Sequence, residues 1–229
     1  MSNANPLNIV MMGATGAVGS EVVAALRSEP GLGKLALLGR RELAGINQEN
    51  IEQHCIDILN PESYQALLSG YQCAICTLGI GEPSKVDKQD FLRIDKQAVL
   101  DFATHCRQAG IEHFQLLSSV GVDAQSRSFY LRSKGELNEA LLALNFKRLS
   151  LFQPSMIITP NNRYGFSQAL TLALWPALSH IMVGPLRKFR GIAVEKLGTA
   201  IARNSQCKTS TGVEVLHWQE FMALDSSTD

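Results

Sequence analysis

The hydrophobic residues of the chain follow two periods, one typical of buried strands and one typical of amphipathic helices. A run over residues 7–12 that is apolar except for Asn8 is followed by apolar residues at helical spacing over residues 20–26. Because a strand covered by helices on both faces is apolar along its whole length, the first run predicts a strand of a parallel sheet. The chain therefore begins with a predicted strand, a tight turn and a helix.

This alternation of short apolar runs and helical patterns continues along the chain. Further strands are predicted at residues 34–38, 54–57, 72–79, 112–119 and 146–152. Helices are predicted at residues 61–68, 87–109, 130–144 and 194–203, a loop or short helix at 44–53, and a strand followed by a helix at 212–224. The order predicts an α/β fold with a doubly wound parallel sheet. We expect one domain over residues 1–229, with a core at about 7–158 and a small C-terminal substrate-side lobe at 159–229.

Glycine occupies every third position after the first strand, at Gly13, Gly16 and Gly19. Gly13 permits a sharp exit from the strand, Gly16 lets the backbone approach a pyrophosphate, and Gly19 lets the helix pack closely on the sheet. The phosphates then face the N-terminus of the helix, where unpaired N–H groups and the helix dipole favour an anion. The pattern predicts the dinucleotide-binding turn of a Rossmann fold in preference to a purely structural turn.

Two arginines follow the second predicted strand, at Arg40 and Arg41. An NAD site usually carries an acid at this place to bind the ribose 2′-hydroxyl, whereas a guanidinium accommodates the 2′-phosphate of NADP. We therefore predict NADP(H) as the cofactor, with Arg40 as the main ligand of the phosphate. The alternative is a solvated pair on a loop.

Candidate catalytic residues follow the fifth predicted strand, which ends in Ser118 and Ser119. Tyr130 and Lys134 are four residues apart and share one face of the next helix. A tyrosine hydroxyl is a poor base near neutrality, and an adjacent ammonium group stabilises its phenolate. The order of these motifs predicts hydride transfer between NADPH and a carbonyl compound, with Tyr130 as the acid or base, Lys134 holding the nicotinamide ribose, and a serine orienting the substrate.

Several segments resemble the Tat-interacting-protein (CC3) group of atypical short-chain dehydrogenases/reductases. They are residues 39–41, 76–79, 116–123, 130–136 and 152–155, and the resemblance covers about residues 9–158. It implies an NADPH-binding fold with a tyrosine–lysine pair. It also implies that Pro154 lies beside the nicotinamide and that Asp57 meets the adenine amino group, although Asp57 could instead cap the next turn. Extended reductases often carry the active hydroxyl one position later, at Val120 here, so the choice of serine stays open.

These inferences give one set of expected site residues. The predicted cofactor contacts are Gly13, Thr15, Gly16, Ala17, Val18, Gly19, Arg40, Arg41, Asp57, Leu78, Gly79, Lys134 and Pro154. Two alternatives to a reductase remain. A sugar-nucleotide epimerase or dehydratase also uses tyrosine and lysine but retains NAD, and a regulator could sense NADPH without turnover.

Composition narrows the expected partners. The chain has 21 Lys and Arg against 21 Asp and Glu, so no basic excess is available for a nucleic-acid backbone or an anionic membrane. The chain start lacks the pattern of a secretory signal, and no apolar run reaches the length of a membrane span. We therefore expect a cytoplasmic protein that binds a small-molecule substrate, with no nucleic acid and no integral membrane segment; a homodimer is left open.

The cysteines and histidines do not predict a metal site. Cys73 and Cys76 are separated by two residues within a predicted strand, where they point to opposite faces, and no second pair exists. The five histidines show no metal-ligand spacing. We also expect reduced thiols in the core. We expect the apolar residues 167–183 to form an ordinary packed helix, and the alternatives are a substrate lid and a contact with another subunit or a membrane surface.

Overall fold

The computed structural model describes residues 6–82, 85–159, 182–207 and 211–226. Seven parallel strands form one sheet in the order β3-β2-β1-β4-β5-β6-β9. They are β1 (Leu7–Met12), β2 (Leu32–Gly39), β3 (Ile51–Cys55), β4 (Cys73–Cys76), β5 (His113–Leu117), β6 (Arg148–Phe152) and β9 (Gly212–Leu216). The sheet order runs in both directions from β1, and the predicted doubly wound parallel sheet is confirmed.

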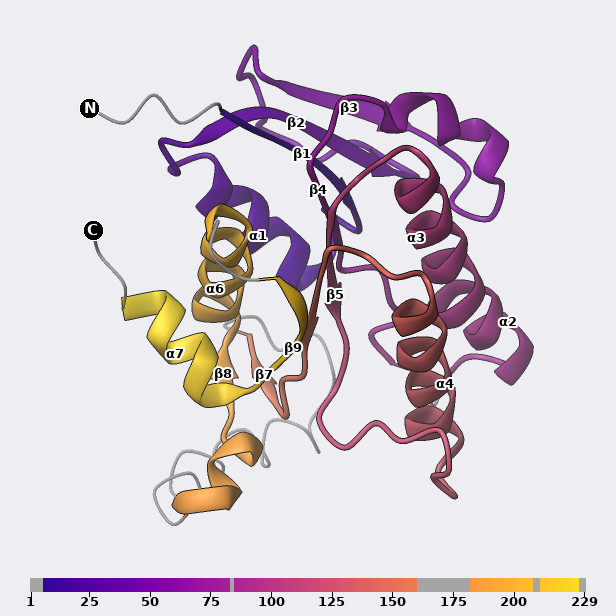
Figure 1. The fold of residues 1–229 in the computed structure, drawn as a ribbon, viewed down its shortest axis with the longest axis vertical. Coiled ribbons are helices and arrows are strands. Elements are labelled where there is room, and N and C mark those ends of the chain that lie inside the picture. Colours follow the sequence, from indigo (N-terminus) through magenta and orange to yellow (C-terminus); the bar gives the residue numbers. More distant parts are fainter. Residues whose placement is uncertain (1–5, 83–84, 160–181, 208–210, 227–229) are drawn as a thin grey trace.

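Helices cover both faces of this sheet (Figure 1). One layer holds α1 (Ala17–Leu26), α6 (Val194–Gln206) and α7 (Trp218–Ser226). The other holds α2 (Lys88–Leu92), a π-helical segment η4 (Arg93–Gln97), α3 (Ala98–Gln108) and α4 (Phe129–Ala143). Short 3-10 helices lie at η1 (Pro61–Ser63), η2 (Gln65–Leu68) and η5 (Gly184–Phe189), and β7 (Ile157–Ile158) pairs with β8 (Ile192–Ala193).

Alternate residues of the central strands feed two hydrophobic cores. In β1, Ile9 and Met11 pack toward α1 and α6, whereas Val10 and Met12 pack toward α3 and α4. All four side chains are fully buried. This two-sided burial explains why the strand is apolar from Ile9 to Met12, as a parallel sheet between two helical layers requires.

Several predicted boundaries differ from the structure. The first helix begins at Ala17, three residues before its predicted start, and the third strand spans 51–55 in place of 54–57. The prediction of a loop or short helix over residues 51–53 is wrong, because these residues begin β3, an edge strand in which Ile51 is buried, Glu52 exposed and Gln53 half-buried. The helix predicted at 87–109 is divided by the π-helical segment η4.

Beyond the predicted core boundary at residue 158, the chain returns to the main sheet. Helix α6 packs closely along α1, and a Cβ atom on Gly198 would lie 2.7 Å from the carbonyl carbon of Glu21. Strand β9 then pairs with β6 and completes the sheet. Of the apolar segment at residues 167–183, residues 167–181 lie outside the described residues.

The cysteines occupy separate environments. Cys73 and Cys76 lie on β4 and point into the two different cores, as predicted. Burial raises the pKa of both thiols to about 12, so they stay protonated. Cys106 is also buried, whereas Cys55 and Cys207 are exposed, so the expectation of core thiols is wrong for these two.

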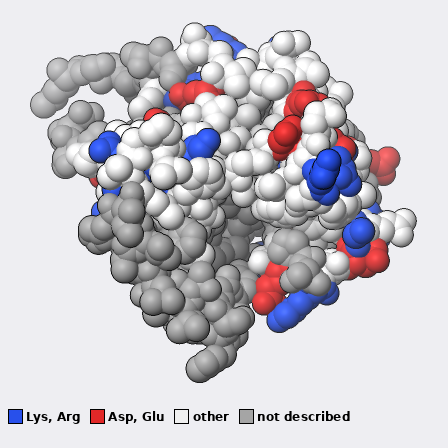
Figure 2. Space-filling model, turned by 90° about the horizontal axis from the view of Figure 1, so that it is seen from below, with Lys and Arg blue, Asp and Glu red and all other residues white. Residues whose placement is uncertain are grey.

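Charged side chains of both signs are interspersed on the face seen in Figure 2. In the described ranges, no helix is long and apolar enough to cross a membrane.

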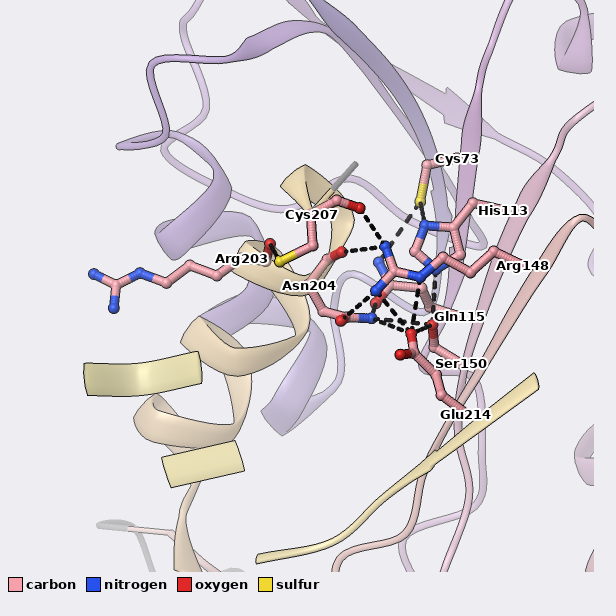
Figure 3. A network of polar contacts seen from close by, with 9 residues as sticks. All are labelled: Cys73, His113, Gln115, Arg148, Ser150, Arg203, Asn204, Cys207 and Glu214. Atoms are coloured by element: carbon pink, nitrogen blue, oxygen red, sulfur yellow. Dashed lines mark hydrogen bonds and ion pairs between the residues drawn. The ribbon is translucent and has the colours of Figure 1, made fainter. Parts of the chain in front are cut away.

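A buried polar network joins α6 to the amino ends of β4, β5, β6 and β9 (Figure 3). The guanidinium of Arg148 lies 2.7 Å from the carboxylate of Glu214, and it donates to the Asn204 side chain and to the backbone oxygens of Asn204 and Cys207. His113 Nε2 lies 2.8 Å from Ser150 Oγ. Neighbouring strands carry these side chains in register, so the sheet itself aligns the network.

The network fixes the charge state of two of its members. Burial raises the pKa of the Glu214 carboxyl, but hydrogen bonds from Ser150, Asn204 and Arg148 and the charge of Arg148 outweigh this effect and bring the pKa below its usual value. Burial lowers the pKa of His113 to about 3, so the imidazole is neutral in the folded protein. Glu214 therefore contributes stability above its usual pKa of 4.5, and this contribution is lost as the pH falls through the lowered value.

We predict that Arg148→Met lowers the free energy of unfolding by about 3 to 5 kcal/mol at neutral pH, because it leaves the Glu214 carboxylate without its countercharge and two backbone oxygens without their donor. The deficit should be smaller at a pH below 4.5, the usual pKa of this carboxyl, because the stability that the lowered pKa of Glu214 contributes is lost as the pH falls. Urea unfolding followed by circular dichroism at both pH values measures this. The neighbouring, exposed Lys147→Met removes the surface pair with Glu112 and should change stability little. Equal effects of the two substitutions would contradict a structural role for the network.

Candidate functional site

A cleft of about 940 Å³ lies along the carboxyl ends of the central strands. Its walls come from the turn after β1, the end of β2, the loop after β4, the end of β5, α4 and the residues after β6. A parallel sheet whose strand order reverses at β1 opens a crevice at this edge. The volume falls within the range typical of ligand pockets.

The glycine turn forms the floor of the cleft. Gly13 has φ +97°, and a Cβ atom there would lie 2.6 Å from the backbone nitrogen of Leu78. Thr77 Oγ1 donates a hydrogen bond to the Gly13 oxygen over 3.1 Å and ties the turn to the end of β4. Only glycine fits this position, because a side chain would meet both an unfavourable backbone conformation and a backbone collision.

The N-terminus of α1 points into the same space. A Cβ atom on Gly19 would lie 2.8 Å from Thr77 Oγ1 and would collide with the Gly13 backbone, so glycine permits the helix to approach. Gly16 caps α1 without any side-chain hydrogen bond, and the first turn has no acidic residue. The N–H groups and the positive dipole end therefore remain available for an anion, and the residues present fit a pyrophosphate.

The arginine pair lies at one end of the cleft. Arg40 and Arg41 are exposed and line it, and in the described part of the chain neither guanidinium has a recorded hydrogen bond or ion pair. The backbone of Leu43 exchanges two hydrogen bonds with the Gln53 side chain, of 2.8 and 3.1 Å. This contact holds the segment after the arginines against β3.

Asp57 is not among the described residues that line the cleft. Its carboxylate accepts a hydrogen bond from the backbone N–H of Leu59 over 2.9 Å. This is the turn-capping contact that the sequence left open as the alternative.

Helix α4 carries a row of polar side chains toward the cleft. Tyr130 and Lys134 both line it, and Asn138 is one further turn along the same face. Ser118 also lines the cleft, is 8% exposed and donates to Asn138 Oδ1 over 3.3 Å. The Tyr130 ring packs against Phe91, with the ring centroids 5.8 Å apart. The structure thus brings Ser118, Tyr130 and Lys134 together from two separate elements.

The other predicted site residues divide between the lining of the cleft and its support. Those that line it are Gly13, Thr15, Gly16, Ala17, Val18, Leu78 and Gly79. Gly19, Ser119 and Pro154 do not line it; the Pro154 oxygen accepts a hydrogen bond from Val120 N–H. The next residues along the chain do, at Ser155, Met156 and Ile157.

Sequence reasoning missed several lining residues that make specific contacts, among them Thr77 and Asp95. Asp95 lies between Phe91 and Val99 on the apolar face of its helix, and it is buried. An acidic residue at a core-facing helical position is unusual, so this spacing in the sequence could have marked Asp95 as a candidate site residue. Thr77 carries no such signal, because a threonine at the end of a strand is ordinary. In the described residues no group of three His, Cys, Asp or Glu side chains could hold a metal ion.

The sequence matches a family described as NAD(P)H-binding over residues 13–147. Protein HTATIP2 of Rattus norvegicus is 31% identical over 153 residues, which cover 66% of this chain and 63% of the rat protein. The chain thus spans less than two thirds of that relative. Protein FMP52-1, mitochondrial, of Scheffersomyces stipitis is 26% identical over 199 residues, which cover 85% of this chain and 82% of the yeast protein.

Solved structures share the fold. MoeE5 in complex with UDP-glucose and NAD superimposes with a TM-score of 0.69 at 17% identity, covering 96% of this chain and 81% of that one. The ADP-L-glycero-D-manno-heptose-6-epimerase of Helicobacter pylori gives a TM-score of 0.68 at 16% identity, with the same coverage. The family match, the similarity to the rat protein and this fold agree with one another. The chain belongs to the NAD(P)H-binding family and is an atypical short-chain dehydrogenase/reductase of the Tat-interacting-protein type.

Proposed function

We propose that this protein is an NADPH-dependent oxidoreductase that transfers a hydride to or from a small carbonyl or alcohol substrate. The main support is the convergence on one cleft of a pyrophosphate-sized glycine turn, two guanidinium groups without a partner in the described residues, and the side chains of Ser118, Tyr130 and Lys134. These groups come from four separate elements. A purely structural cleft would not require donors that remain unpaired.

The residues of the chain have separate roles in this reaction. The turn and the N-terminus of α1 bind the pyrophosphate, and Arg40 and Arg41 bind the 2′-phosphate. When bound, the dihydronicotinamide supplies the hydride that goes to the carbonyl carbon. Tyr130 gives its hydroxyl proton to the carbonyl oxygen and is reprotonated from solvent. Ser118 orients the substrate, for which its one O–H donor would turn from Asn138 Oδ1 to the carbonyl oxygen. Lys134 holds the nicotinamide ribose and stabilises the phenolate.

The two alternative functions, an NADPH sensor and a sugar-nucleotide epimerase, are distinguished from a reductase by the cofactor that the purified protein retains and by whether it oxidises NADPH. A sensor would bind NADPH without oxidising it in the presence of carbonyl compounds, and an epimerase would be purified with NAD retained. Fold likeness to sugar-nucleotide enzymes does not favour either reading, because one fold supports many reactions. A cytoplasmic location stays a prediction, since the fungal relatives carry the word mitochondrial in their names. Homodimer formation also stays open.

We predict that Arg40→Ala weakens NADPH binding about 10- to 100-fold, the usual loss for a hydrogen bond to a charged group, and leaves NADH binding nearly unchanged. Fluorescence titration with both cofactors measures this. Lys34→Ala serves as the control, because it removes a positive charge from the same strand at a position that does not line the cleft. Equal losses for NADPH and NADH would remove the assignment of the 2′-phosphate site.

We predict that Tyr130→Phe lowers kcat about 10²- to 10⁴-fold, the range expected for loss of a positioned acid, with little change in NADPH affinity. A screen of carbonyl compounds first identifies a substrate that the wild-type protein reduces. Tyr64→Phe is a matched control, because it removes a buried phenol oxygen without a hydrogen-bond partner in the described structure. Unchanged turnover in Tyr130→Phe would exclude the proposed acid.

A further inference from the structure

Asp95 occupies a position that a hydrophobic residue would normally hold. It lies in η4 on the stripe that Phe91, Val99 and Phe102 continue into the core. Its side chain is 3% exposed. Burying a carboxylate is costly unless the charge is paired and hydrogen-bonded, so this position implies specific partners.

Both oxygens of the Asp95 carboxylate have a partner at the cleft. Oδ1 lies 2.9 Å from the ammonium nitrogen of Lys134, whose side chain is 5% exposed. Oδ2 accepts a hydrogen bond of 2.7 Å from the backbone N–H of Ile80, in the loop after β4. Ile80, Lys134 and Asp95 all line the cleft. The carboxylate of Asp95, on η4, therefore connects this helical segment to α4 and to the loop after β4.

The loop is fitted closely to this carboxylate. A Cβ atom on Gly79 would lie 3.2 Å from Asp95 Oδ1, so the backbone passes directly beside the ion pair. The π-helical turn brings a second residue against α4, since Lys96 pairs with Glu136, but that pair is considerably more exposed. Single π-helical turns inside α-helices are frequent at functional sites, where they redirect a side chain.

Lys134 has donors to spare after this contact. An ammonium group carries three N–H donors, and Asp95 takes one. In the ranges that the structure describes, no other hydrogen bond or ion pair is recorded for Lys134. A lysine side chain has four rotatable bonds, so anchoring one donor restricts where the other two point. These two N–H donors are then available to a ligand bound in the cleft.

We propose that Asp95 is a positioning residue that orients the Lys134 ammonium toward the nicotinamide ribose and Tyr130. The inference rests on the proposed function, because it assigns Lys134 to the nicotinamide half of NADPH. Asp95 itself touches Lys134 and the loop backbone and acts on the cofactor through them. Asp95 and Lys134 also compensate each other's buried charge when the cleft is empty.

The test compares NADPH with 2′,5′-ADP, a fragment that keeps the adenosine, the 2′-phosphate and the first phosphate of the pyrophosphate but lacks the second phosphate and the nicotinamide riboside. We expect Asp95→Asn to weaken NADPH binding about tenfold, as loss of a charged hydrogen bond does, and to change 2′,5′-ADP binding less than about twofold. The asparagine retains an oxygen for Ile80 N–H. Glu136→Gln removes the neighbouring exposed pair between the same elements and should leave both affinities unchanged.

A double-mutant cycle shows whether Asp95 acts through Lys134. We expect Lys134→Met and the Asp95→Asn, Lys134→Met double variant to bind NADPH equally well, because Asp95 has nothing left to orient. These two variants also keep the comparison possible if Asp95→Asn alone does not fold. Wild-type NADPH affinity in Asp95→Asn, equal weakening of both ligands, or additive losses in the cycle would overturn the proposal. Failure of the wild-type protein to bind NADPH or 2′,5′-ADP would instead overturn the proposed function.

Discussion

The site depends on one close approach of three backbones at the carboxyl edge of the sheet. The turn at Gly13, the first turn of α1 at Gly19 and the end of β4 at Thr77 lie so near one another that a Cβ atom on either glycine would collide. This contact places the N-terminus of α1 over the edge of the sheet, where its unpaired N–H groups attract an anion. The same contact also fixes the end of β4, and the loop that follows β4 forms a further wall of the cleft and meets Asp95.

The two ends of the sheet use buried charge in different ways. At the amino end, Arg148 is surrounded by Glu214, Asn204 and backbone oxygens, so its donors are used within the protein. At the carboxyl end, Lys134 has one recorded partner and the guanidinium of Arg40 has none in the described residues. A saturated network specifies how the elements pack, whereas donors left over in a cleft are available to a ligand.

Local patterns predicted most of the elements and failed where tertiary contacts override them. The buried strands are recognisable because both faces meet a core, as in β1. The start of β3 was missed since an edge strand does not need continuous apolar residues. The π-helical turn at η4 was not predictable from periodicity, because its effect is to let Asp95 meet Lys134, a residue 39 positions later in the chain.

The sequence by itself determined the α/β class, the glycine turn and the shared helical face of Tyr130 and Lys134, because each depends on spacing within a single segment. Only the tertiary structure decided that Ser118, and not Ser119, lines the cleft, that Asp57 caps a turn, and that Asp95 is the partner of Lys134. Such choices depend on which distant segments meet and on how closely their backbones pack, and spacing along one segment carries no information about either.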